Sequence, residues 1–146
     1  MHRKVAAALL AVLALGVTSC GSSGRTVSQA ELVRQVELAC KEAQREVQST
    51  ARRGSGEATV RFVAAVIAGQ RLLIARIKQY DGSGEAKAEF ADFKQTMQQR
   101  LALLERVRSV RSGQLRNAIR GAQAEAEALS TRARAIAARI GFQGCG

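Results

Sequence analysis

Apolar residues recur at alternating intervals of three and four along four stretches of the chain, which is the period of an amphipathic α-helix. Short runs of glycine and serine at 54–56, 82–84 and 112–113 separate these stretches. We therefore expect helices from Ser28 to the first run, and over 57–80, 86–111 and 113–140. Four helices of similar length with short turns predict an all-α, antiparallel up-down-up-down four-helix bundle. The same spacing occurs in intermolecular coiled coils, but the glycine breaks favour a chain that folds back on itself, and oligomers of such bundles stay open.

The first expected helix has a recognisable start and an inward stripe. Ser28 and Glu31 have the spacing of a capping box, in which each side chain satisfies a free backbone N–H. Its apolar stripe consists of Val33, Val36, Cys40, Ala43 and Val47. Cys40 is therefore expected to face the core.

The second expected helix carries two apolar stripes, which predicts broad burial. They are Val60, Val63, Ile67, Ile74 and Ile77, and Phe62, Val66, Leu73 and Tyr80. Gln70 falls in the first stripe, where it would either fix the register from inside or lie at an edge in water. We expect the edge, because an unpaired buried amide is costly.

The last two expected helices each have one seam. The third would pack through Phe90, Phe93, Met97, Leu101, Leu104 and Val107, and the fourth through Leu115, Ile119, Ala122, Ala126, Leu129, Ala133, Ile136 and Ile140. Gly141 is then expected to cap the fourth helix in a left-handed conformation, which would let Phe142 pack back.

The N-terminus has the layout of an export signal. His2, Arg3 and Lys4 precede an uncharged apolar segment at 5–17, which is shorter than the roughly 20 residues that a spanning helix needs. An ordinary secretory signal would be cut after a small residue near its end. However, the segment ends in Val17-Thr18-Ser19-Cys20, which resembles the lipobox of bacterial lipoproteins.

The resemblance to lipoproteins implies that the chain is cut before Cys20 and that this thiol carries lipid with fatty acyl chains such as palmitate. Residues 1–19 would then be the signal peptide, 20–27 a lipidated tether and 28–146 the bundle domain. The protein would sit on the extracytoplasmic face of the cell membrane, anchored by that lipid.

Cysteine number supports this assignment. The chain has three cysteines, Cys20, Cys40 and Cys145, and an odd thiol is a liability in an exported protein. With Cys20 lipidated, Cys40 and Cys145 are left to form one disulfide that staples the bundle, as the oxidising side of a membrane permits. The alternative is two free thiols, one buried and one on the tail.

The layout as a whole resembles small helical lipoproteins of actinobacteria. These carry a lipobox, a cysteine in the first helix, an alanine-rich last helix and a tail of the form Gly-apolar-x-x-Cys, here Gly141-Phe142-Gln143-Gly144-Cys145. The resemblance implies no particular activity.

The charge pattern supplies the one candidate site. The chain has a formal net charge of +11, and its turns bring arginines to one end of the expected bundle. These candidate anion-binding residues are Arg52, Arg53, Arg61, Arg106, Arg108, Arg111, Arg116 and Arg120. They suit an anionic envelope polymer or another envelope protein, or they form a solvated surface that stabilises helix C-termini. Nucleic acid is not expected, because the chain has few aromatic side chains for base stacking.

The residues argue against catalysis and cofactors. The only histidine is His2, in the expected signal, so histidine-based nucleophilic systems and histidine metal sites would be missing from the mature chain. No phosphate-binding glycine motif occurs. We expect a non-enzymatic binding or structural module of the cell envelope, or alternatively a carrier of a small apolar ligand in the bundle core. A cavity between the second-helix stripes and the alanine-rich last seam would favour the carrier.

Overall fold

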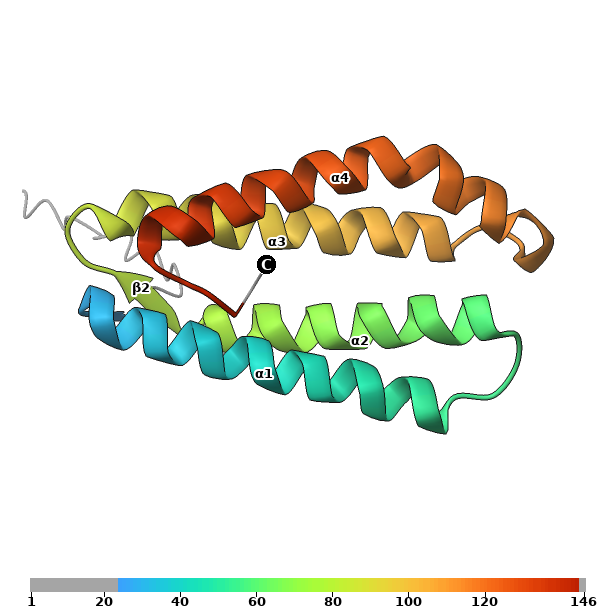
Figure 1. The fold of residues 1–146 in the computed structure, drawn as a ribbon, viewed down its shortest axis with the longest axis horizontal. Helices are drawn as coiled ribbons and strands as arrows, with labels where there is room; N and C mark the ends of the chain where they lie inside the picture. Colours follow the sequence, from blue (N-terminus) through green and yellow to red (C-terminus); the bar gives the residue numbers. More distant parts are fainter. Residues whose placement is uncertain (1–23, 145–146) are drawn as a thin grey trace, which may run out of the picture.

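The computed structural model describes residues 24–144 and shows a bundle of antiparallel helices in this part of the chain (Figure 1). The helices are α1 (Gln29–Arg53), α2 (Ala58–Ile77), α3 (Ala86–Arg108) and α4 (Leu115–Ile140), with a 3-10 turn η1 (Ser112–Gln114) before α4. Two short strands, β1 (Arg25–Val27) and β2 (Tyr80–Gly82), lie at the end where α1 begins. The predicted all-α bundle is therefore confirmed, whereas the predicted signal, Cys20 and Cys145 lie outside the described residues.

The strands were not predicted. β1 pairs in parallel with β2, with Arg25 opposite Tyr80 and Val27 opposite Gly82. This pairing ends the second helix at Ile77 instead of residue 80. Strand β1 also covers the last three residues of the expected tether. Strands of three residues are too short for the alternation that identifies strands in a sequence.

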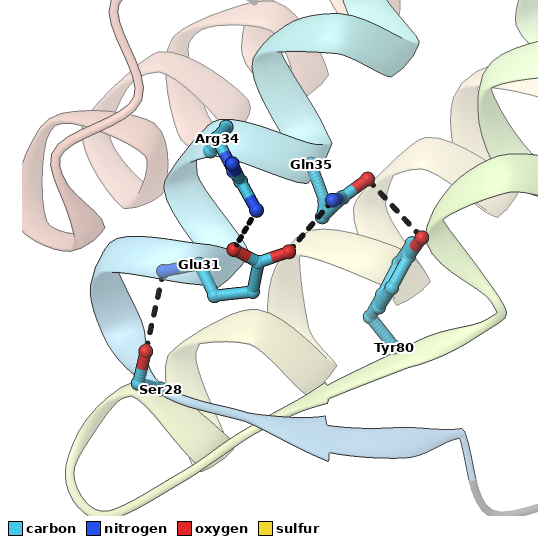
Figure 2. A network of polar contacts seen from close by, with 5 residues as sticks. All are labelled: Ser28, Glu31, Arg34, Gln35 and Tyr80. Atoms are coloured by element: carbon cyan, nitrogen blue, oxygen red, sulfur yellow. Dashed lines mark hydrogen bonds and ion pairs between the residues drawn. The ribbon is translucent and has the colours of Figure 1, made fainter.

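The helix ends follow their predicted caps closely. The Ser28 hydroxyl accepts a hydrogen bond from the Glu31 backbone N–H at 3.3 Å, while the Glu31 carboxylate binds Arg34 and Gln35 instead of completing the capping box (Figure 2). Gly141 has φ of +103°, the left-handed cap that was predicted. Phe142 packs back as expected and is 5% exposed.

The apolar core consists of two clusters of unequal size. The larger one lies toward the strands, where the Phe93 and Phe142 rings meet at 5.4 Å between centroids. The smaller one contains Leu103, Val107 and Leu115 near the opposite end. The core is thus thick at the strand end and thin at the end that carries the α1–α2 and α3–α4 turns.

The predicted seam of α4 is only partly confirmed over its first half, where Leu115 is buried and Ala122 packs against the smaller cluster. Ile119 is 38% exposed and Ala126 is exposed as well. Phe62, from a predicted stripe of α2, is 62% exposed. The reason is that α4 packs on α3 and α1 packs on α2, while α1 and α4 diverge toward the turns (Figure 1). Near the strands the two outer helices still touch, and Gln29 Nε2 donates to the Ile140 carbonyl at 3.0 Å.

One helix within residues 24–144, α2, is long and apolar enough to cross a membrane by length and composition. In the structure it packs against α1 and α3 (Figure 1).

Candidate anion-binding site

The eight predicted arginines lie at one end of the bundle, which we call the basic end (Figure 1). They occupy the ends of α1 and α3, the starts of α2 and α4, and the loop before η1. Contact between the two turns is direct, because Arg116 Nη2 lies 3.8 Å from Glu57 Oε1. The antiparallel topology therefore brings together residues that are far apart in the sequence.

Half of these arginines already have protein partners. Arg106 pairs with Glu125 at 2.5 Å, Arg53 lies 3.8 Å from Glu46, and Arg116 lies near Glu57 as above. The Arg61 guanidinium donates to the Gly56 carbonyl at 2.6 Å. These contacts hold the turns in place and reduce the charge that a ligand would meet.

The other four arginines are exposed and have no ion pair with a residue in the described part of the chain. They are Arg52, Arg108, Arg111 and Arg120. Arg52 and Arg108 lie in last turns of helices, where a cation interacts favourably with the helix dipole. Chemically, this set can bind an extended anion but offers no nucleophile, acid or base.

An apolar groove opens beside the basic end, where α1 and α4 diverge. It has a volume of about 270 Å³ and apolar walls from three helices. The walls include Phe62 and Val63 of α2, Leu103, Leu104 and Val107 of α3, and Ile119, Ala122 and Ala126 of α4. Most of these positions were predicted to lie in closed helix seams, whereas in the structure they line an open groove.

The strand end is held by a polar network (Figure 2). The Tyr80 hydroxyl donates to Gln35 Oε1 at 3.1 Å, and Gln35 Nε2 donates to Glu31 Oε1 at 2.7 Å. The hydrogen bond from Gln35, aided by that from Arg34 and its positive charge, lowers the pKa of Glu31 below its ordinary value. This network joins β2 to the first turns of α1 and therefore fixes the end at which the chain enters.

Two polar side chains lie where the sequence predicted apolar packing or water. Gln70 is 8% exposed, and its Nε2 donates to the Met97 carbonyl at 3.1 Å. The prediction of an edge position for Gln70 is therefore wrong, because α3 supplies the partner that a buried amide needs. Arg100 of α3 lies beside it, on the side of the helix where Leu101 and Leu104 were expected to form the seam. Arg100 was not among the residues predicted from the sequence.

Cys40 is 4% exposed and lies on the inner face of α1, as its stripe predicted. Cys20 and Cys145, the other two predicted modification sites, are outside the described residues. Over residues 24–144, no group of three histidine, cysteine or carboxylate side chains is placed to hold a metal ion.

Comparison with known proteins adds no identity to this geometry. No protein-family model, no curated protein and no solved structure matches the chain.

Proposed function

We propose that the protein is a lipid-anchored module on the extracytoplasmic face of the cell membrane, which binds an anionic envelope polymer through its basic end without catalysing a reaction. The observation that carries the proposal is the set of four exposed arginines at the end opposite β1, which form no ion pair with another residue over 24–144. A chain that enters through β1 would present these arginines away from its anchor (Figure 1). Exposed cations on one surface attract extended polyanions.

The anchor rests on the lipobox at Cys20. With lipid on this thiol, labelled palmitate should be incorporated into the wild-type protein and not into Cys20→Ser. Absence of acyl mass on residue 20 of the wild-type protein would contradict the anchored location.

We also propose a disulfide between Cys40 and Cys145. Its support is the course of the tail: Phe142 is buried, the Gln143 N–H donates to Glu37 Oε1 at 3.2 Å, and Gly144 and Cys40 line the same cavity. The chain thus reaches the neighbourhood of Cys40 one residue before Cys145. Closing a loop of roughly 100 residues stabilises a protein by about 2–4 kcal/mol. Non-reduced peptide mapping should find the two cysteines linked, and free thiols on both would refute the bond.

Binding through the basic end can be tested with a substituted set of arginines. Arg108, Arg111 and Arg120 are replaced together by Gln, and affinity for poly(glycerol phosphate) is measured over a series of salt concentrations. We expect about tenfold weaker binding, equivalent to roughly 1.4 kcal/mol. Wild-type affinity should also fall steeply with salt, because exposed charges are screened over about 10 Å at 0.1 M.

The matched control replaces three exposed lysines away from the basic end, Lys41, Lys78 and Lys87. The control removes the same charge, so it should retain most of the affinity. Equal losses from both sets would show that only net charge matters. No binding by the wild-type protein at low salt would overturn the proposal.

A second candidate function, a carrier of a small apolar ligand, is favoured by the open groove. Its walls combine the α2 stripe with the α4 seam, which is where a carrier of this fold would hold its ligand. A diazirine-labelled fatty alcohol should crosslink to Phe62 and Ile119. Leu38, which is 49% exposed on α1 and outside the groove, provides the control position. Crosslinks that fall equally on Leu38 would reflect surface contact and count against a carrier.

A further inference from the structure

Polar side chains interrupt the apolar core of the bundle midway along its length. On α3, Met97 is the last residue of the larger cluster and Leu103 is the first residue of the smaller cluster. Arg100 lies between them, three residues from each. On α2, Gln70 occupies the facing position and is buried. Gln70 and Arg100, which we call the interior polar layer, therefore lie where two helices would otherwise present aliphatic side chains.

The interior polar layer borders a cavity of about 200 Å³. Its remaining walls come from α1, α2 and the tail, namely Cys40, Ala43, Gln44, Val47, Val66, Gly69, Leu73 and Gly144. Gly69 marks a close approach of α1 and α2, because a Cβ there would lie 2.4 Å from Val47 Cγ2. This close approach forms one wall of the cavity, which shares no lining residue with the groove at the basic end.

The Arg100 charge has no counter-ion in the described part of the chain. Two arginines of α2 are matched: Arg71 pairs with Glu105 at 2.7 Å and Arg76 with Glu42 at 2.8 Å. By contrast, the half-buried Arg100 guanidinium donates from Nη1 to Met97 Sδ at 4.0 Å, and sulfur is a weak acceptor. Burial lowers the pKa of Arg100 by desolvating its charged form.

A partly buried cation in this position destabilises the protein unless an anion pairs with it. Removing a charge from water is unfavourable, and a close counter-ion with good hydrogen bonds offsets this cost. Among residues 24–144, no carboxylate side chain lines the cavity. The Gln70 amide nitrogen is already used by the Met97 carbonyl, so Arg100 holds the unused donors.

We propose that this cavity binds a small monocarboxylate with a short alkyl chain. The guanidinium fork of Arg100 would hold the carboxylate through two parallel N–H donors. The alkyl chain would lie against Ala43, Val66 and Leu73, which are apolar walls of the cavity. A single cation and mostly apolar walls fit a monoanion with a hydrophobic part better than a multiply charged phosphate. This site does not depend on the basic end or on the groove.

The test uses butyrate and the lipidated protein in phosphatidylcholine nanodiscs, with empty nanodiscs as the blank. Saturation-transfer NMR should detect butyrate on the wild-type protein, and titration should give its dissociation constant. Arg100→Met should weaken binding by about tenfold or more, as expected for loss of a charged hydrogen-bonded partner. Butyramide, which has the same shape without the charge, should bind the wild-type protein correspondingly weakly.

Three controls separate binding from folding. Arg134→Met removes an exposed arginine of α4 and should leave butyrate binding unchanged. Arg100→Lys keeps the charge without the fork and should bind with intermediate affinity. Arg100→Met should melt no lower than the wild-type protein, because it replaces an uncompensated cation with an apolar side chain.

Several outcomes would overturn the site. These are no wild-type signal above empty nanodiscs, equal binding of butyrate and butyramide, or an equal loss of affinity in Arg134→Met. Unchanged butyrate affinity in Arg100→Met would show that Arg100 does not hold the ligand, and a large drop in the melting temperature of that variant would then assign Arg100 to structure alone.

Discussion

At the scale of single residues, Glu31 shows how one carboxylate serves several contacts. Its backbone N–H is capped by Ser28, and its carboxylate accepts from Gln35 and Arg34 (Figure 2). Gln35 in turn accepts from Tyr80. One ionised side chain therefore supports both the start of α1 and its link to β2.

The pH dependence of this contribution has a definite sign. Because the pKa of Glu31 is lower in the folded protein, its ionised form stabilises the fold above the ordinary value of 4.5. The contribution is lost as pH falls through the lower, folded pKa. Glu31→Gln should therefore reduce the free energy of unfolding at pH 7 and have little effect at pH 3, as measured by urea unfolding.

Glu127→Gln provides the comparison for Glu31. Glu127 also accepts from a glutamine four residues away, at 2.9 Å, but no described cation lies within ion-pair distance of it. Its substitution should change stability less at pH 7. If the effect of Glu31→Gln were the same at both pH values, ionisation of Glu31 would not contribute.

The pattern of apolar residues predicted the burial of apolar side chains better than it predicted which polar side chains lie inside the bundle. The stripe correctly placed Val36, Cys40 and Ala43 inside. It could not decide the position of Gln70, because the deciding partner is a backbone carbonyl 27 residues away. Arg100 was missed because a periodic search counts apolar residues, and an arginine on the inner face is counted as polar surface.

At the scale of elements, two glycines inside helices have opposite roles. A Cβ on Gly69 of α2 would meet Val47 Cγ2 at 2.4 Å and the Ala43 carbonyl oxygen at 2.8 Å. A Cβ on Gly121 of α4 would have no neighbour within 4 Å. The first glycine permits close packing of α1 on α2, whereas the second only weakens its helix.

The same substitution at these two positions should therefore change stability in opposite directions. Gly69→Ala should lower the free energy of unfolding by about 1–3 kcal/mol through overpacking. Gly121→Ala should raise it by roughly 0.5–1 kcal/mol, because alanine favours the helix interior. Thermal or urea unfolding measures both, and a stabilised Gly69→Ala would show that α1 and α2 are not held at this distance.

Element boundaries were predictable where a local signal exists. Ser28 and Gly141 identified two ends correctly because caps are formed by adjacent residues. The end of α2 was placed too late, since it depends on pairing between residues as distant as Arg25 and Tyr80. Such pairing leaves no local trace in three-residue strands.

At the scale of the whole molecule, stability should decrease from the strand end to the basic end. The larger apolar cluster holds the second half of α4 through Ala133, Ile136 and Ile140. The first half contributes one fully buried residue, Leu115, to the smaller cluster. Local opening costs least where few apolar contacts must break.

Hydrogen exchange should reveal this gradient along α4. Backbone amides over 116–126 should exchange at least about tenfold faster than those over 133–140, since tenfold corresponds to roughly 1.4 kcal/mol in local opening. A ligand that fills the groove should slow exchange in the first segment selectively. Uniform protection along α4 would indicate instead that the bundle opens as one unit.

The topology of the bundle was predictable, but its opening was not. Turn positions and helix lengths define the order of four antiparallel helices. Whether α1 and α4 contact each other near the turns depends on how the α1–α2 pair packs against the α3–α4 pair along the bundle. The residue types at positions 119 and 126, isoleucine and alanine, do not reveal this. Their apolar character suits a closed seam and an open groove equally well.

The parallel pairing of β1 with β2 has a mechanical consequence. The Arg25 N–H donates to the Gln79 carbonyl at 2.9 Å, and β2 belongs to the segment that joins α2 to α3. A pull on the chain before Gly24 runs along β1 and loads its ladder in shear, so several hydrogen bonds resist together. The force is then transmitted to β2, in the segment between α2 and α3. The first turn of α1 is therefore protected from unwinding.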